Sequence, residues 1–200
     1  MGGNALEIET KRVGLDSYYR IRDEDSFGDL DLLLPKPKLP NLSEFLSDYL
    51  NSREIKTNND IVSFEYKNFQ VDLIHCPYPI LDIAQVYFSY NDLGMLMGML
   101  AKRVGCKYGH SGLYLVTYNE SKSKKWETFL SKDPKEIFPF LGLDYERFCQ
   151  GFDSLENVFD YVYSSNLFDS EAFLKEKEWN HRRRTRNRKR PTWQRFVDYI

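Results

Sequence analysis

Short apolar runs separated by turn-forming residues predict strands in the first 118 residues of the chain. These predicted strands span residues 18–21, 30–34, 61–66, 69–74 and 112–118. The dipeptide Lys67-Asn68 separates the third run from the fourth and has the length of a tight hairpin turn. Apolar residues three and four positions apart predict helices over residues 5–14, 43–50 and 92–104.

Beyond residue 133 the spacing of apolar residues is helical. The predicted helices span residues 133–140, 144–149, 154–163 and 170–180. We therefore expect an α+β fold, in which a mixed sheet with helices on one side is followed by a mainly helical region. The change of pattern gives a first domain over residues 1–125 and a helical C-terminal region over residues 126–200.

The composition predicts a folded protein with an uneven distribution of charge. Hydrophobic residues make up 42% and aromatic residues 16% of the 200 residues, enough for a packed core without disulfides. The net charge is −2, yet residues 181–190 hold seven of the 28 basic residues. The rest of the chain is left with 21 basic against 30 acidic residues, so the dense basic segment predicts contact with a polyanion.

The sequence contains neither a signal peptide nor an apolar run of the roughly 18 residues that cross a membrane. The three cysteines are scattered and odd in number, which is typical of a reducing compartment. We therefore expect a cytoplasmic protein with no membrane partner. The pattern makes no prediction of its oligomeric state.

Three aspartates occur where a buried strand needs no charge. Asp29 and Asp31 flank one leucine at the start of the run 30–34, so their side chains point to the same face of the strand. Asp72 lies within the apolar run 69–74, where an unpaired carboxylate is costly. Most isolated Asp-x-Asp pairs are ordinary surface residues. The apolar setting of these three favours a site in which they converge on cations.

Carboxylate oxygens are hard ligands, which suit Mg²⁺ or Mn²⁺ better than Zn²⁺. Two such ions about 3.5–4 Å apart stabilise the attacking and leaving oxygens in phosphoryl transfer. If the two strands are neighbours, Asp29, Asp31 and Asp72 are candidate ligands of two Mg²⁺ or Mn²⁺ ions. The same three residues are then the candidate catalytic residues.

The segment SFGDLDLL at residues 26–33, followed by Val71-Asp72-Leu73, resembles the palm of the polymerase-beta-type nucleotidyltransferase superfamily and, more narrowly, of family X DNA polymerases. That family carries Gly-Asp-hydrophobic-Asp on one strand and a third aspartate on a neighbouring strand. Residues 88–115 are similar to the family's segment in which a strand leads into a helix with a basic end and then an edge strand. The resemblance covers residues 18–118 and implies transfer of a nucleoside monophosphate from a nucleoside triphosphate.

The resemblance also implies contacts with the nucleotide. Superfamily members place a Gly-Gly or Gly-Ser motif before the first aspartate, where its amides hold the triphosphate. Gly2-Gly3 fits in type but lies further upstream than usual, so either residues 5–25 loop out or Ser26 and Gly28 contribute instead. In the family, the start of the later similar segment lies against the incoming nucleotide. The candidate nucleotide-binding residues are Gly2, Gly3, Ser26, Gly28, Tyr90 and Asn91.

A phosphate-binding motif at residue 2 leaves no room before the palm for the amino-terminal DNA-gripping domains of cellular family X enzymes. Small viral members of the superfamily also lack these domains. By analogy we expect a viral or phage protein, which would act in the cytoplasm of its host.

The basic segment 181–190 lies between Trp179 and Trp193. Arginine binds phosphates bidentately, and flanking tryptophans can stack on bases. A solvated surface run or a localisation signal would have the same composition. Beside such a palm, however, we expect contact with DNA or RNA. The candidate nucleic-acid-binding residues are Arg182, Arg183, Arg184, Arg186, Arg188, Lys189 and Arg190.

Together these observations predict a metal-dependent nucleotidyltransferase that acts on a hydroxyl, with a nucleic-acid 3′ end as the expected acceptor. One alternative is a sugar transferase that uses Asp29 and Asp31 to hold a metal-bound nucleotide-sugar. That alternative leaves Asp72 and the basic segment unexplained. The other alternative is a nucleic-acid-binding or structural protein whose palm is inactive.

Overall fold

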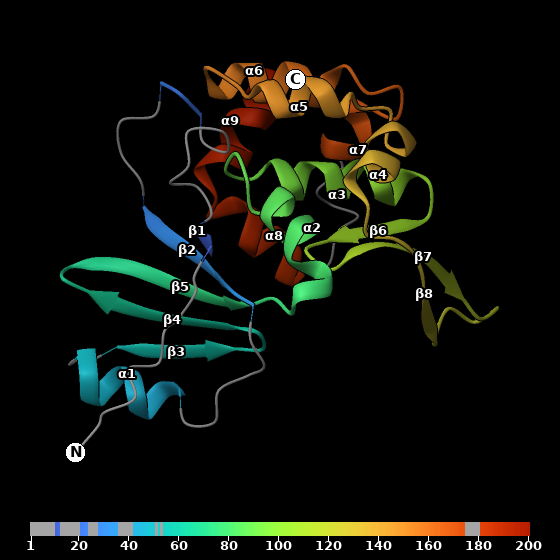
Figure 1. The fold of residues 1–200 in the computed structure, drawn as a ribbon. Helices are drawn as coiled ribbons and strands as arrows, with labels where there is room; N and C mark the ends of the chain where they lie inside the picture. Colours follow the sequence, from blue (N-terminus) through green and yellow to red (C-terminus); the bar gives the residue numbers. More distant parts are fainter. Residues whose placement is uncertain are drawn as a thin grey trace.

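The computed structural model describes residues 11–12, 21–23, 28–35, 42–50, 52, 54–174 and 181–200. These residues form an α+β structure with a five-stranded sheet, a three-stranded sheet and a group of helices. In Figure 1 the larger sheet lies on the left, the smaller sheet on the right and most of the helices above them. None of the helices within these ranges is long and apolar enough to cross a membrane.

The five-stranded sheet has the order β1-β2-β5-β4-β3. Its strands are β1 (Lys11–Arg12), β2 (Asp29–Leu34), β3 (Ile55–Asn58), β4 (Ile61–Tyr66) and β5 (Phe69–His75). β2 and β5 are parallel and the other neighbours are antiparallel, so the sheet is mixed. Lys67 and Asn68 join β4 to β5 with φ angles of 52° and 63°, as a tight type I′ hairpin requires. The predicted hairpin is confirmed.

Most predicted helices are confirmed, and several shorter elements were not predicted. The helices are α1 (Leu42–Leu50), η1 (Tyr78–Ile80), α2 (Leu81–Tyr87), α3 (Leu93–Arg103), α4 (Pro134–Phe140), α5 (Tyr145–Gln150), α6 (Leu155–Tyr163), α7 (Ser170–Leu174), α8 (His181–Arg188) and α9 (Pro191–Tyr199). The helix predicted over residues 5–14 falls mostly outside the described residues, and its described part, β1, is a strand. Likewise, residues 175–180 of the last predicted helix lie outside the described residues.

Different helices cover the two faces of the five-stranded sheet. Alternate residues of a strand point to opposite faces. Leu46 of α1 packs against Val71 and Leu73 on one face, whereas Ala84 of α2 packs against Ile74 on the other. The prediction of helices on one side of the sheet is therefore wrong, because α2 returns over the opposite face directly after β5.

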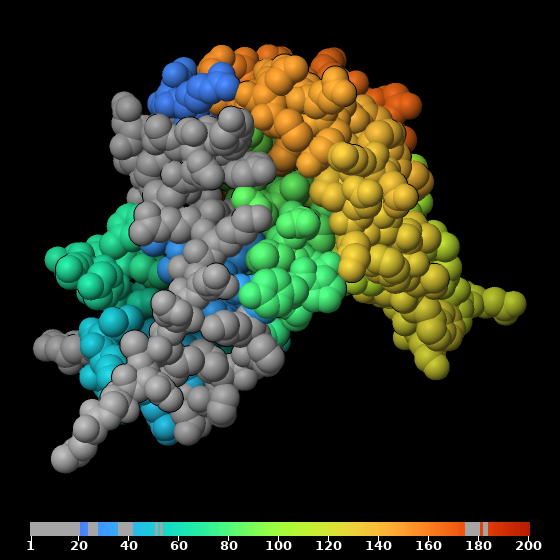
Figure 2. Space-filling view, in the orientation of Figure 1, coloured from blue at the N-terminus to red at the C-terminus, as the bar shows by residue number. Residues whose placement is uncertain are grey.

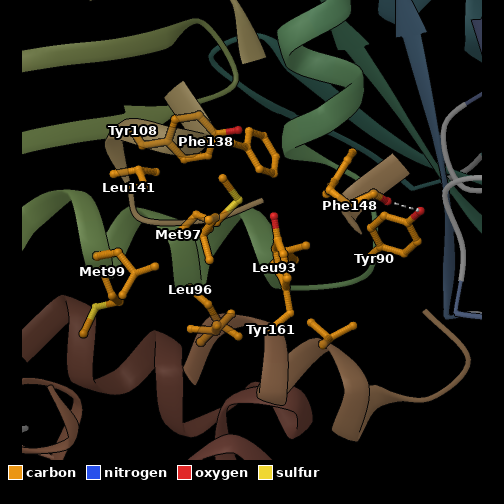
Figure 3. Close-up of a cluster of buried hydrophobic side chains, with 14 of the residues drawn as sticks. Tyr90, Leu93, Leu96, Met97, Met99, Tyr108, Phe138, Leu141, Phe148 and Tyr161 are labelled. Carbon is orange, nitrogen blue, oxygen red and sulfur yellow. Dashed lines mark hydrogen bonds between the residues drawn. The ribbon is translucent and has the colours of Figure 1, made fainter. Parts of the chain in front are cut away.

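The smaller sheet is antiparallel and contains β6 (Cys106–Gly109), β7 (Gly112–Tyr118) and β8 (Lys125–Ser131) in that order. It flanks the largest hydrophobic core, in which α3 is central and Leu96 and Met97 are buried (Figure 3). The core takes side chains from α2, α3, β6 and β7 and also from α4, α5, α6, α7 and α9. The predicted boundary at residue 125 falls at the start of β8, and the division into two domains stays a prediction.

The two glycines within α3 have different surroundings. A Cβ atom added at Gly94 would lie 2.2 Å from the backbone oxygen of Tyr87, whereas one at Gly98 would lie 3.6 Å from that of Tyr108. We expect Gly94→Ala to destabilise the fold by about 1–3 kcal/mol, because α2 and α3 would have to move apart. The matched Gly98→Ala should instead stabilise it by up to about 1 kcal/mol through helix propensity. Urea unfolding measures both, and equal stabilities would contradict the close contact at Gly94.

Candidate metal centre

The three predicted aspartates come together on one face of the five-stranded sheet. Asp31 of β2 is the register partner of Asp72 on the parallel strand β5, and Asp29 precedes Asp31 by two residues. Partners on adjacent strands share a face, as do residues two apart on one strand. Each aspartate offers a carboxylate oxygen, and these oxygens all lie within 4.8 Å of one another. The predicted convergence of these three residues is present in the structure.

This face of the sheet changes from polar to apolar along the strands. Leu33 and Ile74 follow Asp31 and Asp72 by two residues each and are buried in the cluster that contains Ala84 of α2. The carboxylates are less covered: Asp29 is exposed, and Asp31 and Asp72 are partly buried. Packing of α2 on the apolar half therefore fixes the strands and leaves the acidic half accessible to a ligand.

Burial and mutual repulsion both act on the carboxylates. Burial, followed by the charges of Asp29 and Asp72, raises the pKa of Asp31 from the usual 3.8 to about 7. Burial, followed by the charges of Asp72 and Asp92, also raises the pKa of Asp29. A bound cation would offset this repulsion and favour the ionised form of each group.

No lysine or arginine within the described residues forms an ion pair with Asp29, Asp31 or Asp72. The Nε2 atom of Gln70 donates a hydrogen bond of 3.1 Å to Oδ1 of Asp72. A neutral amide orients the carboxylate without cancelling its charge. Among the described residues, therefore, no basic side chain neutralises the three aspartates.

The donor set fits a divalent cation that prefers oxygen ligands. Mg²⁺ binds oxygen at 2.0–2.1 Å, so two of its ligand oxygens lie at most about 4.2 Å apart. Separations of up to 4.8 Å need only small side-chain rotations to reach a shared ion. Acidic groups of this kind also occur without a metal, so the fit indicates a capacity to bind and does not identify an occupant.

A fourth aspartate, Asp92, lies close enough for its charge to raise the pKa of Asp29. Asp92 is the N-cap residue of α3, but its side chain makes no capping hydrogen bond. Its carboxylate instead forms an ion pair with Arg190, from the end of the basic segment. Burial raises the pKa of Asp92, and the charges of Arg190 and Arg186 oppose that rise. Sequence reasoning missed this link, because the two partners lie 98 positions apart and no local pattern pairs them.

The predicted nucleotide contacts are described only in part. Gly2, Gly3 and Ser26 lie outside the described residues. Gly28 directly precedes Asp29 and is exposed, and no atom lies within 4 Å of where its Cβ would be. Asn91 is exposed as well. The contacts expected of these residues stay predictions.

Tyr90 does not lie at a surface where a nucleotide could reach it. Its side chain is 2% exposed, and its hydroxyl donates a hydrogen bond of 3.2 Å to the backbone oxygen of Phe148 (Figure 3). Its ring packs edge-on against Phe148 and Phe152. This burial argues against the predicted contact between Tyr90 and a nucleotide. The residue instead anchors the turn before α3 to the helical core.

The basic segment forms α8 and the turn into α9. Arg186, Arg188 and Lys189 are exposed, and Arg184 is partly buried. Arg190 is partly buried in its ion pair with Asp92, and the side chains of Arg182 and Arg183 lie outside what the structure describes. Contact of these seven residues with nucleic acid stays a prediction.

Of the two tryptophans beside this segment, the structure describes Trp193. Trp193 is fully buried and packs against Phe173 and Phe196, so its predicted stacking on bases is wrong. Trp179 lies outside the described residues. Asn187 of α8 is also buried, which shows that one side of this basic helix faces the protein.

Comparison with known proteins does not place the chain in a family. No protein-family model matches it, and no curated protein matches it either. The resemblance to the polymerase-beta-type superfamily therefore stays a hypothesis. It rests on the three aspartates and on the segments around them.

Proposed function

We propose that the chain is a metal-dependent nucleotidyltransferase that moves a nucleoside monophosphate from a nucleoside triphosphate to the hydroxyl of a nucleic-acid 3′ end. The observation that carries this proposal is the convergence of Asp29, Asp31 and Asp72, with carboxylate oxygens within 4.8 Å of one another. It is supported by the position of the third aspartate on a strand next to the first two, as in the polymerase-beta-like palm. That palm is the fold we propose for residues 1–125.

In the proposed reaction the acceptor oxygen forms a bond to the α-phosphorus of the triphosphate. The bond from that phosphorus to the bridging oxygen breaks, and pyrophosphate leaves. Asp29 and Asp31 would hold both ions, and Asp72 would hold one of them. Bound divalent ions supply electrostatic stabilisation of the attacking and leaving oxygens. The negative charge of Asp72, oriented by Gln70, favours loss of the proton from the acceptor hydroxyl.

A sugar transferase would need Asp29 and Asp31 but not the third carboxylate. Asp72 lies beside Asp31 in the register of the sheet, where it could serve as the third ligand in the proposed reaction. This position favours the nucleotidyltransferase over the sugar transferase. Burial, followed by repulsion among the carboxylates, raises the pKa values of Asp29 and Asp31 and destabilises their ionised forms. In a palm without activity nothing would compensate for this cost, so the arrangement favours an active site over an inactive palm.

The proposal is tested with a labelled primer, with and without a template, and each of the common ribonucleoside and deoxyribonucleoside triphosphates. We expect extension of the primer and release of pyrophosphate in the presence of Mg²⁺ or Mn²⁺, and loss of both when EDTA is added. Parallel reactions contain nucleotide-sugars in place of the triphosphates. Sugar transfer, or the absence of metal-dependent turnover with every triphosphate, would overturn the proposal.

A further inference from the structure

β7 and β8 pair with each other and project from the body of the molecule, and β6 pairs with the first part of β7 (Figures 1 and 2). We call residues 112–131 the β7–β8 ribbon. β8 is an edge strand, since its other side pairs with no strand among the described residues. Six of its seven residues are exposed, so neither face of β8 is covered by the body of the protein.

The ribbon exposes large aromatic side chains. Tyr118 is 55% exposed, Trp126 44% and Phe129 51%. The neighbouring Leu130 is exposed as well. Single exposed apolar side chains are common on protein surfaces. Several of them on one projecting element instead indicate a surface that binds a partner.

Lysines lie among these aromatic residues. The ribbon contains three lysines and two glutamates, and two further lysines lie beside it, Lys107 on β6 and Lys132 directly after β8, whereas the chain as a whole has a net charge of −2. The ammonium of Lys124 lies 5.2 Å from the ring centroid of Trp126, and that of Lys107 lies 5.7 Å from the ring centroid of Tyr114.

Trp126 is in register with Thr117, and Phe129 with Tyr114, so the two rings lie on opposite faces of the ribbon. Each face therefore presents a lysine together with an aromatic ring.

Two of these lysines are held in place by one glutamate. Glu127 accepts hydrogen bonds from Lys107 at 2.7 Å and from Lys125 at 2.5 Å. Tyr114 and Phe129 pack edge-on beside them, with ring centroids 5.6 Å apart. Two cations share one anion here, so this arrangement keeps a net positive charge beside an ordered aromatic pair.

This chemistry disfavours a protein partner, a second copy of the chain included. Lysine is depleted in the cores of protein interfaces. A lysine and a bulge on an edge strand are devices that prevent pairing with another strand, and β8 has both, in Lys125 and in the register shift opposite Leu113 and Tyr114. Cations with exposed rings are the combination that binds single-stranded nucleic acid, in which phosphates are neutralised and bases stack on aromatic side chains.

We propose that the β7–β8 ribbon binds single-stranded nucleic acid around the edge strand β8, with Trp126 stacking on bases from one face, Phe129 stacking on bases from the other, and the lysines contacting phosphates. In Figure 1 the ribbon lies on the opposite side of the molecule from the five-stranded sheet that carries the aspartates. The ribbon would thus hold a part of the strand distant from the reacting end. The identity of the bound strand as the acceptor rests on the proposed function, whereas the binding itself does not.

The test measures binding without any turnover. Fluorescence anisotropy is recorded for the full chain and labelled single strands of about 16 nucleotides, the upper site size of one single-strand-binding module, in EDTA and without triphosphate. DNA and RNA strands are tested separately. We expect Trp126→Ala and Phe129→Ala each to weaken binding by about tenfold, the effect of losing one base stack. Lys124→Gln with Lys125→Gln should weaken binding and reduce its salt dependence.

Tyr163→Ala is the matched control, because Tyr163 on α6 is an equally exposed aromatic residue outside the ribbon. It should bind as the wild type does, and thermal unfolding shows that each variant is folded. Wild-type affinity in both aromatic variants would overturn the proposal. So would a dimer in sedimentation that Trp126→Ala dissociates, since the ribbon would then be an interface between copies. Because this assay contains no metal, failure of nucleotidyl transfer leaves its result unchanged.

Discussion

Replacing Asp31 with asparagine is expected to lower the rate of nucleotidyl transfer by about 10³-fold or more while the chain stays folded. The amide has nearly the shape of the carboxylate but lacks its charge, so it cannot replace an anionic ligand of a divalent ion. Loss of several kcal/mol of electrostatic stabilisation in the transition state corresponds to a factor of about 10³. The rate is measured as incorporation of labelled nucleotide at saturating Mg²⁺.

The same substitution separates catalysis from folding. Burial and the charges of Asp29 and Asp72 destabilise the ionised carboxylate of Asp31 in the folded chain. The neutral amide should therefore make the metal-free chain more stable near neutral pH, although it removes activity. Asp48→Asn, on an exposed position of α1, is the matched control and should change neither property. A variant with Asp31→Asn that turns over at the wild-type rate would contradict the catalytic role.

The candidate site was predictable because it depends on local patterns. Asp29 and Asp31 share a face through the two-residue period of a strand, and Lys67-Asn68 fixes β4 beside β5 through a two-residue turn. The remaining step, the pairing of β2 with β5, was a condition that the sequence could state but not prove. The structure meets it with Asp31 in register with Asp72.

The parts that sequence reasoning missed depend on contacts between distant residues. Tyr90 and Trp193 each have an apolar ring and a polar group, so a surface role and a core role were equally compatible with the local sequence. Tertiary packing decides between them, through Phe148 for Tyr90 and through Phe173 for Trp193. β8 was missed for another reason. Six of its residues are exposed, so it lacks the alternation of buried and exposed positions that predicts a strand.

Mg²⁺ is expected to raise the melting temperature of the wild-type chain near pH 8 and to have little effect near pH 5. The pKa of Asp31 in the folded chain is about 7, so at the lower pH a proton occupies the carboxylate and competes with the ion. At a concentration of about 100 times its dissociation constant, a ligand stabilises the folded state by about 2.7 kcal/mol. For a chain of this size that corresponds to a rise of about 5–10 °C.

Without Mg²⁺, titration of Asp31 makes the wild-type chain less stable as the pH rises. The folded chain holds the proton of Asp31 more tightly than the unfolded chain, whose pKa is near 3.8. The resulting stability is fully present below about pH 3.8 and is lost as the pH rises through about 7. Asp31→Asn has no such proton, so comparison of the two proteins by calorimetry, with and without Mg²⁺, separates Asp31 from the other titrating groups. An equal response to Mg²⁺ in both proteins, or none in the wild type near pH 8, would mean that the aspartates do not hold the ion on which the proposed chemistry depends.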